Sequence, residues 1–248
     1  MKQPEEDRGF LYLVVGQVLL AVLFLFITSP VYADNQISIE QSGNDFSLTV
    51  DQTGANNTVK LLDTNSYINM SSLDLIIKQI NNTSGENQVV IDEMSGSNNQ
   101  VRICQGCAWA YMGSTTDHST TYDGIEGGGH YVEIDLYGSG NRVSGHQTNQ
   151  GSTTGHNFEL HLAGDDNDVQ WRQQSDGAKN IDLTIYNDEN EVLLRQKGNG
   201  ANHTMTIELD GTYGTSLELI QLGTTTQSYT LQQNCLTVGG CSVTITQQ

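Results

Sequence analysis

A short phrase recurs along the chain: an apolar residue, any residue, a second apolar residue, any residue, and then glutamine. Strict alternation of this kind is typical of a β-strand with one buried face, because successive side chains point to opposite sides of the strand. The glutamine falls on the same face as the two apolar residues. The phrase ends at Gln41, Gln52, Gln79, Gln105, Gln173, Gln196, Gln221, Gln233 and Gln247.

A glutamine amide on an inner face is costly unless its donors and its acceptor are all paired. If the strands stack in register, each glutamine side chain can bond to the glutamine above it and to the one below it. We therefore predict that the chain folds so that these side chains form one continuous internal ladder.

The spacing of the repeats predicts stacked strand-turn-strand units. Residues 157–248 divide into units of about a dozen residues, each beginning with alternating β-formers and most ending in Gly, Asn or Asp, which tolerate turns. Residues 34–105 repeat the theme less regularly, with a break between 58 and 74, and residues 131–248 carry the second set of repeats. Residues 106–130 have no period and are rich in Gly, Ser and Thr, so we predict an inserted loop there.

The first 33 residues differ from the rest. An apolar run at residues 10–27 is followed by Val31 and Ala33, small residues of the kind that signal peptidase requires. We predict a cleaved secretory signal peptide at 1–33, with an N-terminal membrane anchor as the alternative, because the run is nearly long enough to span a bilayer. Either form exports the remainder.

Composition supports an extended β structure and excludes one class of partner. Both prolines, Pro4 and Pro30, precede residue 34, and proline interrupts a strand ladder because it has no amide hydrogen. The formal net charge is −19 at pH 7. Such a surface repels nucleic acid, so we expect no nucleic-acid partner.

A finer pattern, glycine or asparagine followed by asparagine and then glutamine, predicts tight turns between paired strands. In each case the second strand ends in an inward glutamine. The pattern joins Gly96, Asn99 and Gln105; Gly138, Asn141 and Gln147; Gly164, Asn167 and Gln173; and Asn187, Asn190 and Gln196.

This spacing resembles the curlin repeat, Q-x-G-x-G-N-x-A-x-x-x-Q, of the subunits of bacterial curli fibres. The Gly, the Asn and the final Gln match, whereas the position of the first Gln carries Met94, Leu136, Leu162 and Ile185. The resemblance covers most of residues 37–248 except the insertion. It implies an all-β, curlin-like β-solenoid whose rungs form two parallel sheets, with about 4.8 Å between rungs.

The resemblance also implies a structural function without a cofactor. The chain would be an exported subunit, or a nucleator, of an extracellular amyloid-like fibre (pilus) used in adhesion and in biofilm matrix. Its partners would be other copies of itself, other curlin-like subunits and an outer-membrane secretion machinery.

Two other functions are compatible with parts of the sequence. The chain could be a monomeric cell-surface adhesin whose 106–130 loop binds glycan or protein, since Trp109, Tyr111, Tyr122 and the adjacent Tyr131 lie near one another in sequence. Equally, these aromatics could cover the end of a rung. Paired carboxylates such as Glu159 and Asp182 could resemble the sites of polysaccharide lyases. No nucleophile-base-acid grouping emerges, so we expect no enzymatic activity.

Four cysteines, at Cys104, Cys107, Cys235 and Cys241, allow redox chemistry, zinc binding or structural disulfides. No helix or βαβ pattern follows the C-x-x-C pair, and the spacing of the second pair does not suit a zinc knuckle. We favour structural disulfides in an exported chain. Three pairings are possible, and we predict the local one, 104 with 107 and 235 with 241.

The histidines and the acidic turns are expected to bind no metal. The histidines lack a ligand spacing, and we predict surface positions for His118, His130, His146, His156, His161 and His203. The acidic turns could bind calcium, but we favour solvated carboxylates that suppress unwanted sheet association. They contain Asp165, Asp166, Asp168, Asp188, Glu189 and Glu191.

Overall fold

Parallel strands stacked in register form the body of the molecule. The computed structural model describes residues 35–39, 44–61, 71–81, 83–91, 96–107, 127–136, 138–149 and 152–248. The predicted signal peptide or anchor, Gln41 and the three aromatics of the insertion lie outside these residues. In the described part of the chain, no helix is long and apolar enough to cross a membrane.

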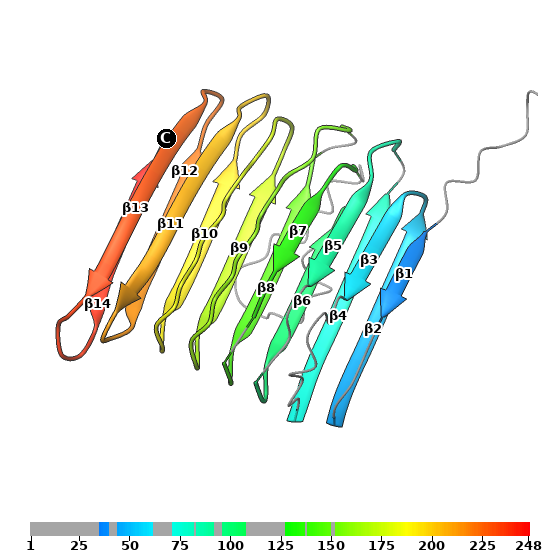
Figure 1. Ribbon diagram of the computed structural model, residues 1–248. Helices are drawn as coiled ribbons and strands as arrows, with labels where there is room; N and C mark the ends of the chain where they lie inside the picture. Colours follow the sequence, from blue (N-terminus) through cyan, green and yellow to red (C-terminus); the bar gives the residue numbers. More distant parts are fainter. Residues whose placement is uncertain are drawn as a thin grey trace, which may run out of the picture. The chain divides into compact units, whose positions relative to one another are not determined.

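One layer is a single sheet of eight strands, all parallel and paired without a shift of register (Figure 1). In order across the sheet, the strands are β2 (Asn44–Gly54), β4 (Ser71–Asn81), β6 (Gln100–Gln105), β8 (Arg142–Thr148), β9 (Asp168–Gln174), β10 (Glu191–Lys197), β12 (Thr215–Leu222) and β14 (Cys241–Gln247). In β6, β8, β9, β10, β12 and β14, the strand begins after a turn rich in Asn, Asp or Gly and then alternates inward residues, mostly apolar, with outward residues, mostly polar.

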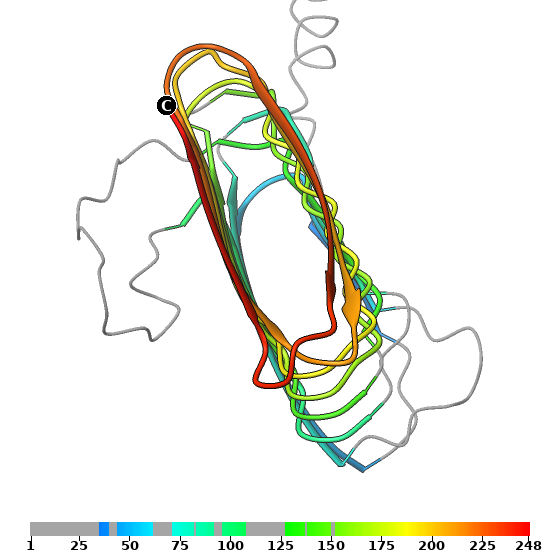
Figure 2. The same ribbon diagram turned by 90° about the vertical axis from the view of Figure 1, so that its left-hand side faces the viewer.

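The facing layer consists of two shorter parallel sheets, and turns connect it to the first layer at both edges, as the view along the stack shows (Figure 2). The first sheet contains four strands and the second contains two. They are β1 (Gln36–Ile39), β3 (Asn57–Leu61), β5 (Asn87–Ile91) and β7 (Tyr131–Ile134), and then β11 (His203–Gly211) and β13 (Gln227–Cys235). The prediction of an all-β parallel solenoid is confirmed.

The facing layer departs from the expected single sheet between β7 and β11. Residues 156–162 and 179–186 keep the inward and outward alternation, but they form no regular strand, and Glu159 and Asp182 have φ angles of 73° and 122°. Backbone hydrogen bonds from Tyr131 to His156 and from Asn157 to Lys179 place the carboxylates of Glu133, Glu159 and Asp182 in one outward column. Like charges directly opposite one another destabilise strand pairing, which gives a physical reason for the interruption.

The insertion predicted at 106–130 does not divide the stack. It separates β6 from β7 along the chain, yet β6 pairs directly with β8 in the long sheet and β5 pairs directly with β7 in the facing layer. The repeats on either side of the insertion therefore form one continuous solenoid.

Apolar side chains from both layers fill the space between them in columns that run along the stack. The largest is Trp171 on β9, whose ring stacks on that of Phe158 in the facing layer, with 3.7 Å between centroids and 2° between planes. Gly145 on β8 is the register partner of Trp171, and a Cβ atom at Gly145 would lie 1.8 Å from Cζ2 of the indole. A glycine on the neighbouring rung thus makes the room that the indole occupies.

We expect Gly145→Ala to lower the free energy of unfolding by about 1 to 3 kcal/mol, since the added methyl group has to displace an indole already held against Phe158. Urea denaturation of the purified monomer measures the change. Ser144→Ala, at the outward-facing neighbour on the same strand, is the control and should change stability by less than about 0.5 kcal/mol. A Gly145→Ala protein as stable as wild type would contradict this account of the core.

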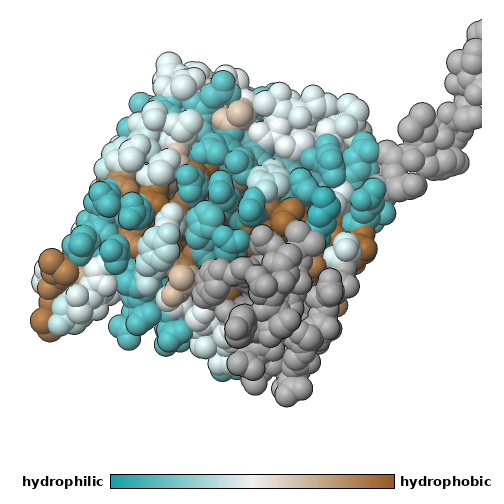
Figure 3. All heavy atoms as spheres, viewed as in Figure 1, coloured by the Kyte–Doolittle hydropathy of each residue, from teal (hydrophilic) through white to brown (hydrophobic). Residues whose placement is uncertain are grey.

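Both disulfides form the predicted local pairs, Cys104 with Cys107 and Cys235 with Cys241. The first lies on the outer side of the long sheet, where its sulfurs pack with Ile80 in a small second apolar cluster. The second closes the turn between β13 and β14. That turn exposes Leu236 and Val238, and it forms a hydrophobic tip at the corner of an otherwise largely hydrophilic face (Figure 3).

Candidate functional site: internal amide ladders and edge strands

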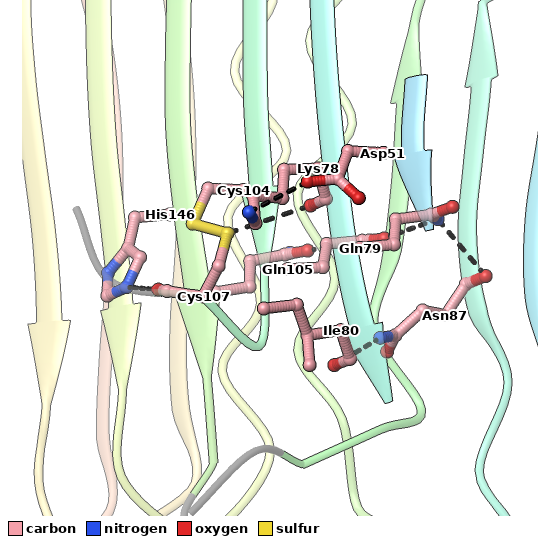
Figure 4. Close-up of a disulfide and its surroundings, with 10 residues drawn as sticks. Asp51, Lys78, Gln79, Ile80, Asn87, Cys104, Gln105, Cys107 and His146 are labelled. Carbon is pink, nitrogen blue, oxygen red and sulfur yellow. Dashed lines mark hydrogen bonds and ion pairs between the residues drawn. A yellow bond between two sulfur atoms is a disulfide. The ribbon is translucent and has the colours of Figure 1, made fainter. Parts of the chain in front are cut away.

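Eight glutamines of the long sheet form one internal ladder. In each pair of neighbouring strands, the Nε2 atom of one glutamine donates to the Oε1 atom of the next, over 2.7 to 3.0 Å. Gln79 and Gln105 are seen at consecutive steps in Figure 4. The ladder runs through Gln52, Gln79, Gln105, Gln147, Gln173, Gln196, Gln221 and Gln247.

The same amides also connect the two layers. Nε2 of Gln105 donates to the carbonyl of Gln88 at 2.9 Å, and Nε2 of Gln173 donates to the carbonyl of Lys179 at 2.8 Å. Both carbonyls belong to the facing layer. Gln79, Gln105, Gln147 and Gln173 therefore use both of their N–H groups, which offsets the cost of burying an amide. Gln196 and Gln221 are also buried and donate only to the next glutamine of the ladder.

The ladder has a direction. Every described step runs from an Nε2 donor to the Oε1 acceptor of the next rung toward the C-terminus. At one edge, Oε1 of Gln52 accepts no hydrogen bond from any described residue, and at the other edge Nε2 of Gln247 donates to none. One edge of the sheet presents an amide acceptor and the opposite edge presents an amide donor.

Two of the predicted ladder members are not in it. Gln41 lies outside the described residues. For Gln233 the prediction is wrong: it lies on β13 in the facing layer, directly over Leu209 of β11. The phrase ending in glutamine occurs in both layers, and alternation alone separates inward from outward positions without distinguishing the layers.

The predicted turn residues form a second ladder, which the sequence reasoning missed. The side-chain Oδ1 atom of each asparagine accepts the backbone N–H of the next, from Asn99 to Asn141 at 2.9 Å and onward through Asn167 and Asn190 to Thr215. Its signal in the sequence was the constant spacing from this asparagine to the ladder glutamine. Asn187 lies beside this column and donates to the carbonyl of Tyr213.

Glycine is required beside the asparagine ladder because the turns stack closely. Gly96 and Gly138 have φ angles of 93° and 75°, and a Cβ atom at Gly96 would lie 1.6 Å from the carbonyl oxygen of Gly138. Gly164 makes the same close approach, with 2.1 Å from its hypothetical Cβ to the oxygen of Asn187. The predicted tight turns are present at these positions.

The structure overturns the surface prediction for four histidines, three of which belong to a third buried column. His130, His156 and His203 are buried where the facing layer begins, and His146 is buried on the outer side of β8, where its Nε2 lies 2.7 Å from the carbonyl oxygen of Cys107. Only His161 is partly exposed among the described histidines, and His118 lies outside them. The sequence signal that was missed is the position of the three histidines in the column. Each lies two residues before the first inward apolar residue of its strand or segment.

The members of this third column are Asn57, Asn87, His130, His156, Lys179 and His203. The N–H of His156 donates to Nδ1 of His130 at 3.1 Å, and the Lys179 ammonium donates to the carbonyls of Asp176, Gly177 and Ala201. Burial lowers the pKa of Lys179 to about 8, although the charge of Asp176 opposes the shift.

Burial also lowers the pKa of each histidine in this column. The pKa of His156 falls to about 3, although a hydrogen bond to the carbonyl of Thr148 opposes the shift. The pKa of His130 falls well below its ordinary value, and the neighbouring His156 adds to the effect. The lowered pKa values favour the neutral form of the imidazole rings in this column.

The acidic turns satisfy neighbouring backbone groups. A side-chain oxygen of Asp165 accepts the N–H of Ser139 at 2.6 Å, and one of Asp188 accepts the N–H of Asp165 at 2.8 Å. Glu159 and Asp182 lie on the outer side of the facing layer, in neighbouring rungs. Across the residues that the structure describes, no three His, Cys, Asp or Glu side chains are placed to hold a metal ion.

No family model, curated protein or solved structure matches the chain. The fold and the site define a class of protein: a parallel β-solenoid with disulfides, internal amide ladders and edge strands that each pair with a described strand on one side only.

Proposed function

We propose that the chain is an exported structural subunit, or a nucleator, of an extracellular curli-like amyloid fibre that serves adhesion and biofilm matrix. One observation supports the proposal most directly. The inward residues of β1 and β2, at one edge of the stack of rungs, are of the same chemical type as the residues of β13 and β14 in the same columns at the other edge. A second copy placed against either edge would therefore continue the same internal structure. Parallel sheet edges with unpaired N–H and C=O groups are templates for such addition.

The match is close in the long sheet. At one edge β14 presents Val243, Ile245 and Gln247, and the β2 residues in the same three columns at the other edge are Leu48, Val50 and Gln52. If β2 of an incoming copy pairs with β14 in the register used throughout the sheet, aliphatic residues meet aliphatic residues and amide meets amide.

The facing layer follows the same rule. Tyr229 and Leu231 of β13 share columns with Ile37 and Ile39 of β1, through the strands and segments that lie between them. Ile37 is 52% exposed at its edge, although residues of the same column are fully buried farther inside the stack. Covering this edge with another rung would remove that apolar surface from water.

The direction of the glutamine ladder supports head-to-tail addition. The amide donor of Gln247 at one edge complements the acceptor of Gln52 at the other, as each step within the chain does. Addition of two like edges would place donor against donor or acceptor against acceptor, and it would also reverse the parallel strand direction. Subunits added head to tail generate an open filament rather than a closed ring when the rotation does not close.

The partners in this proposal are other copies of the chain, other curlin-like subunits and an outer-membrane secretion machinery. The net charge of −19 keeps free subunits apart and repels nucleic acid. Acidic turns on the outer surface act in the same direction, because they oppose sideways association of sheets.

Incubation of the purified exported chain tests the proposal. We expect fibres that bind thioflavin, seed fresh monomer and give a meridional reflection near ~4.8 Å with the strands perpendicular to the fibre axis. A protein that stays monomeric at high concentration and ignores seeds would overturn the proposal. A stable monomer that binds a glycan or protein only when residues 106–130 are present would establish the adhesin alternative instead.

A further inference from the structure

We infer that the outer face of the long sheet is a docking surface for the outer face of the facing layer of a second copy, so that fibres associate side by side. The inference rests on the proposed function, because it concerns contacts between fibres that have already formed. It gives a partner to both outer faces, which addition end to end leaves in water.

The cations of the chain are gathered on one face. Six of the eight lysine and arginine residues after residue 33 point outward from the long sheet. Arg195 and Lys197, at the end of β10, form no ion pair with any described residue, although the net charge of the chain is −19. Three other cations of this face do form ion pairs, Lys78 with Asp51, Arg102 with Asp74 and Arg142 with Asp168.

The facing layer presents the opposite charge at the same height along the stack. Asp182 points outward from it and forms no ion pair with a described residue. One turn connects the segment of Asp182 to β10, so Asp182 and Arg195 belong to one rung and point out of opposite faces (Figure 2). Glu159 and Arg172 are related in the same way in the preceding rung.

Two stacks of like charge therefore lie back to back. Arg172 and Arg195 are register partners on β9 and β10, and Glu159 and Asp182 follow one another in an outward column of the facing layer. Like charges directly opposite one another destabilise strand pairing. A neighbouring copy at equal height would place the cationic stack of one molecule against the anionic stack of the other, which offsets the repulsion within both.

The exposed apolar side chains follow the same arrangement. Among the described residues, only Tyr186 and Leu193 expose large apolar side chains on the outer faces, 57% and 43% respectively, since the others lie at the β1 edge and in the β13–β14 turn. Leu193 precedes Arg195 by two residues, and Tyr186 follows Asp182 by four. Strands of the two layers run in opposite directions, so each apolar side chain lies on the same side of its charged neighbour. When Arg195 meets Asp182 of a second copy, Leu193 and Tyr186 come together and leave water.

A few contacts per subunit are enough because a fibre repeats them. Two fibres of one fold have the same spacing between rungs, so a match at one subunit recurs at every following subunit, and weak contacts add through multivalency. The acidic turns lie at the borders of the layers. They leave the middle of each face open to this approach and oppose the others.

Exchange of charge between the two faces tests the inference on preformed fibres. At about 0.1 M salt, where repulsion between net charges is screened beyond about 10 Å, wild-type fibres should form bundles in electron micrographs. Fibres of Arg195→Glu and of Asp182→Lys should each be bundled about fivefold less often, because like charges then meet across the contact. A mixture of the two variant fibres should bundle within about twofold of wild type, because the two reversed charges attract each other.

Two further variants separate the contact from net charge and from folding. The double variant Arg195→Glu/Asp182→Lys has the net charge of wild type and should form bundles with its own fibres. Arg142→Glu is the matched control, since it makes the same change of charge on the same face at a cation already 3.9 Å from Asp168, and it should leave bundling within about twofold of wild type.

Elongation on the variant's own seeds reports whether the fold is intact, and it should stay within about threefold of wild type because both side chains lie outside the core. Where a reversal of charge prevents fibre formation, Arg195→Gln and Asp182→Asn take its place. Each should lower bundling about threefold.

Each outcome leads to a different conclusion. If wild-type fibres stay single, or if the mixture bundles no more than either variant alone, the docking surface is overturned and the fibre function stands. If fibres bundle only after a sulfated polysaccharide is added, and Arg195→Glu abolishes this effect, the cationic face binds a polyanion and the inference is overturned. If the wild-type chain forms no fibre at all, both the function and the docking surface are overturned.

Discussion

Replacement of Gln173 by alanine is expected to lower the free energy of unfolding by roughly 3 to 5 kcal/mol, the largest effect of a single side chain that the structure indicates. Gln173 is fully buried, accepts from Gln147 at 2.9 Å, and donates to Gln196 at 3.0 Å and to the carbonyl of Lys179 at 2.8 Å. Its loss leaves three buried polar groups without this partner and opens a cavity between the layers.

Urea denaturation of dilute monomer measures this effect, and the same strand provides a matched control. Gln170 is an outward, exposed glutamine on β9, so Gln170→Ala should change stability by less than about 0.5 kcal/mol. If the two alanine variants are equally stable, the glutamine ladder does not hold the layers together.

The second large effect is a loss of stability in acid that depends on His156. Its pKa is lowered to about 3 in the folded protein, because burial disfavours the charged ring, whereas the ordinary pKa of an unfolded histidine is about 6.5. The unfolded chain therefore binds more protons between these two values. The contribution of neutral His156 to the free energy of unfolding is fully present above pH 6.5 and decreases as the pH falls. At pH 4 the loss from this residue alone is about 3 kcal/mol.

The variant His156→Asn isolates this contribution. Asparagine already occupies the same column at Asn57 and Asn87, so it fits the site and carries no titrating group. The difference in unfolding free energy between wild type and variant should change by about 3 kcal/mol from pH 7 to pH 4. A difference that is independent of pH would show that His156 is not held neutral by burial.

His161 provides a control of opposite sign. Burial lowers its pKa, but the hydrogen bond and charge of Asp135 outweigh burial, so the pKa of His161 is raised overall. The contribution of charged His161 to the free energy of unfolding is present below pH 6.5 and is lost as the pH rises through the pKa of His161 in the folded protein. We therefore expect His161→Asn to weaken the protein more at pH 5 than at pH 8.

Much of the fold follows from local patterns in the sequence. Alternation identifies the strands, and the constant distance from Asn99 to Gln105 and from Asn141 to Gln147 predicts that successive strands stack in register. The local disulfide pairs follow from the short spacing between the cysteines of each pair. These inferences succeed because a shift of register by one residue would turn every buried side chain outward.

Other features of the structure depend on which residues of different rungs and layers lie next to one another. Gln233 has the same local pattern as the ladder residues, but its strand lies in the facing layer. His130, His156 and His203 have no metal-ligand spacing, and their burial follows from the column that they share in the facing layer, whereas His146 is buried on the outer side of β8. The two interrupted segments likewise depend on carboxylates that are far apart in sequence and stack on one another.

The sequence by itself determined that this chain is a parallel stack of short strands with inward glutamines, because a period of two residues dictates which side chains face the core. Only the tertiary structure decided how those glutamines are divided between the layers, which polar groups are sealed in the third column, and that the opposite edges present matching residues. The physical reason is that inward orientation is set by each strand alone, whereas the partner of an inward side chain is set by the rung above and the layer opposite.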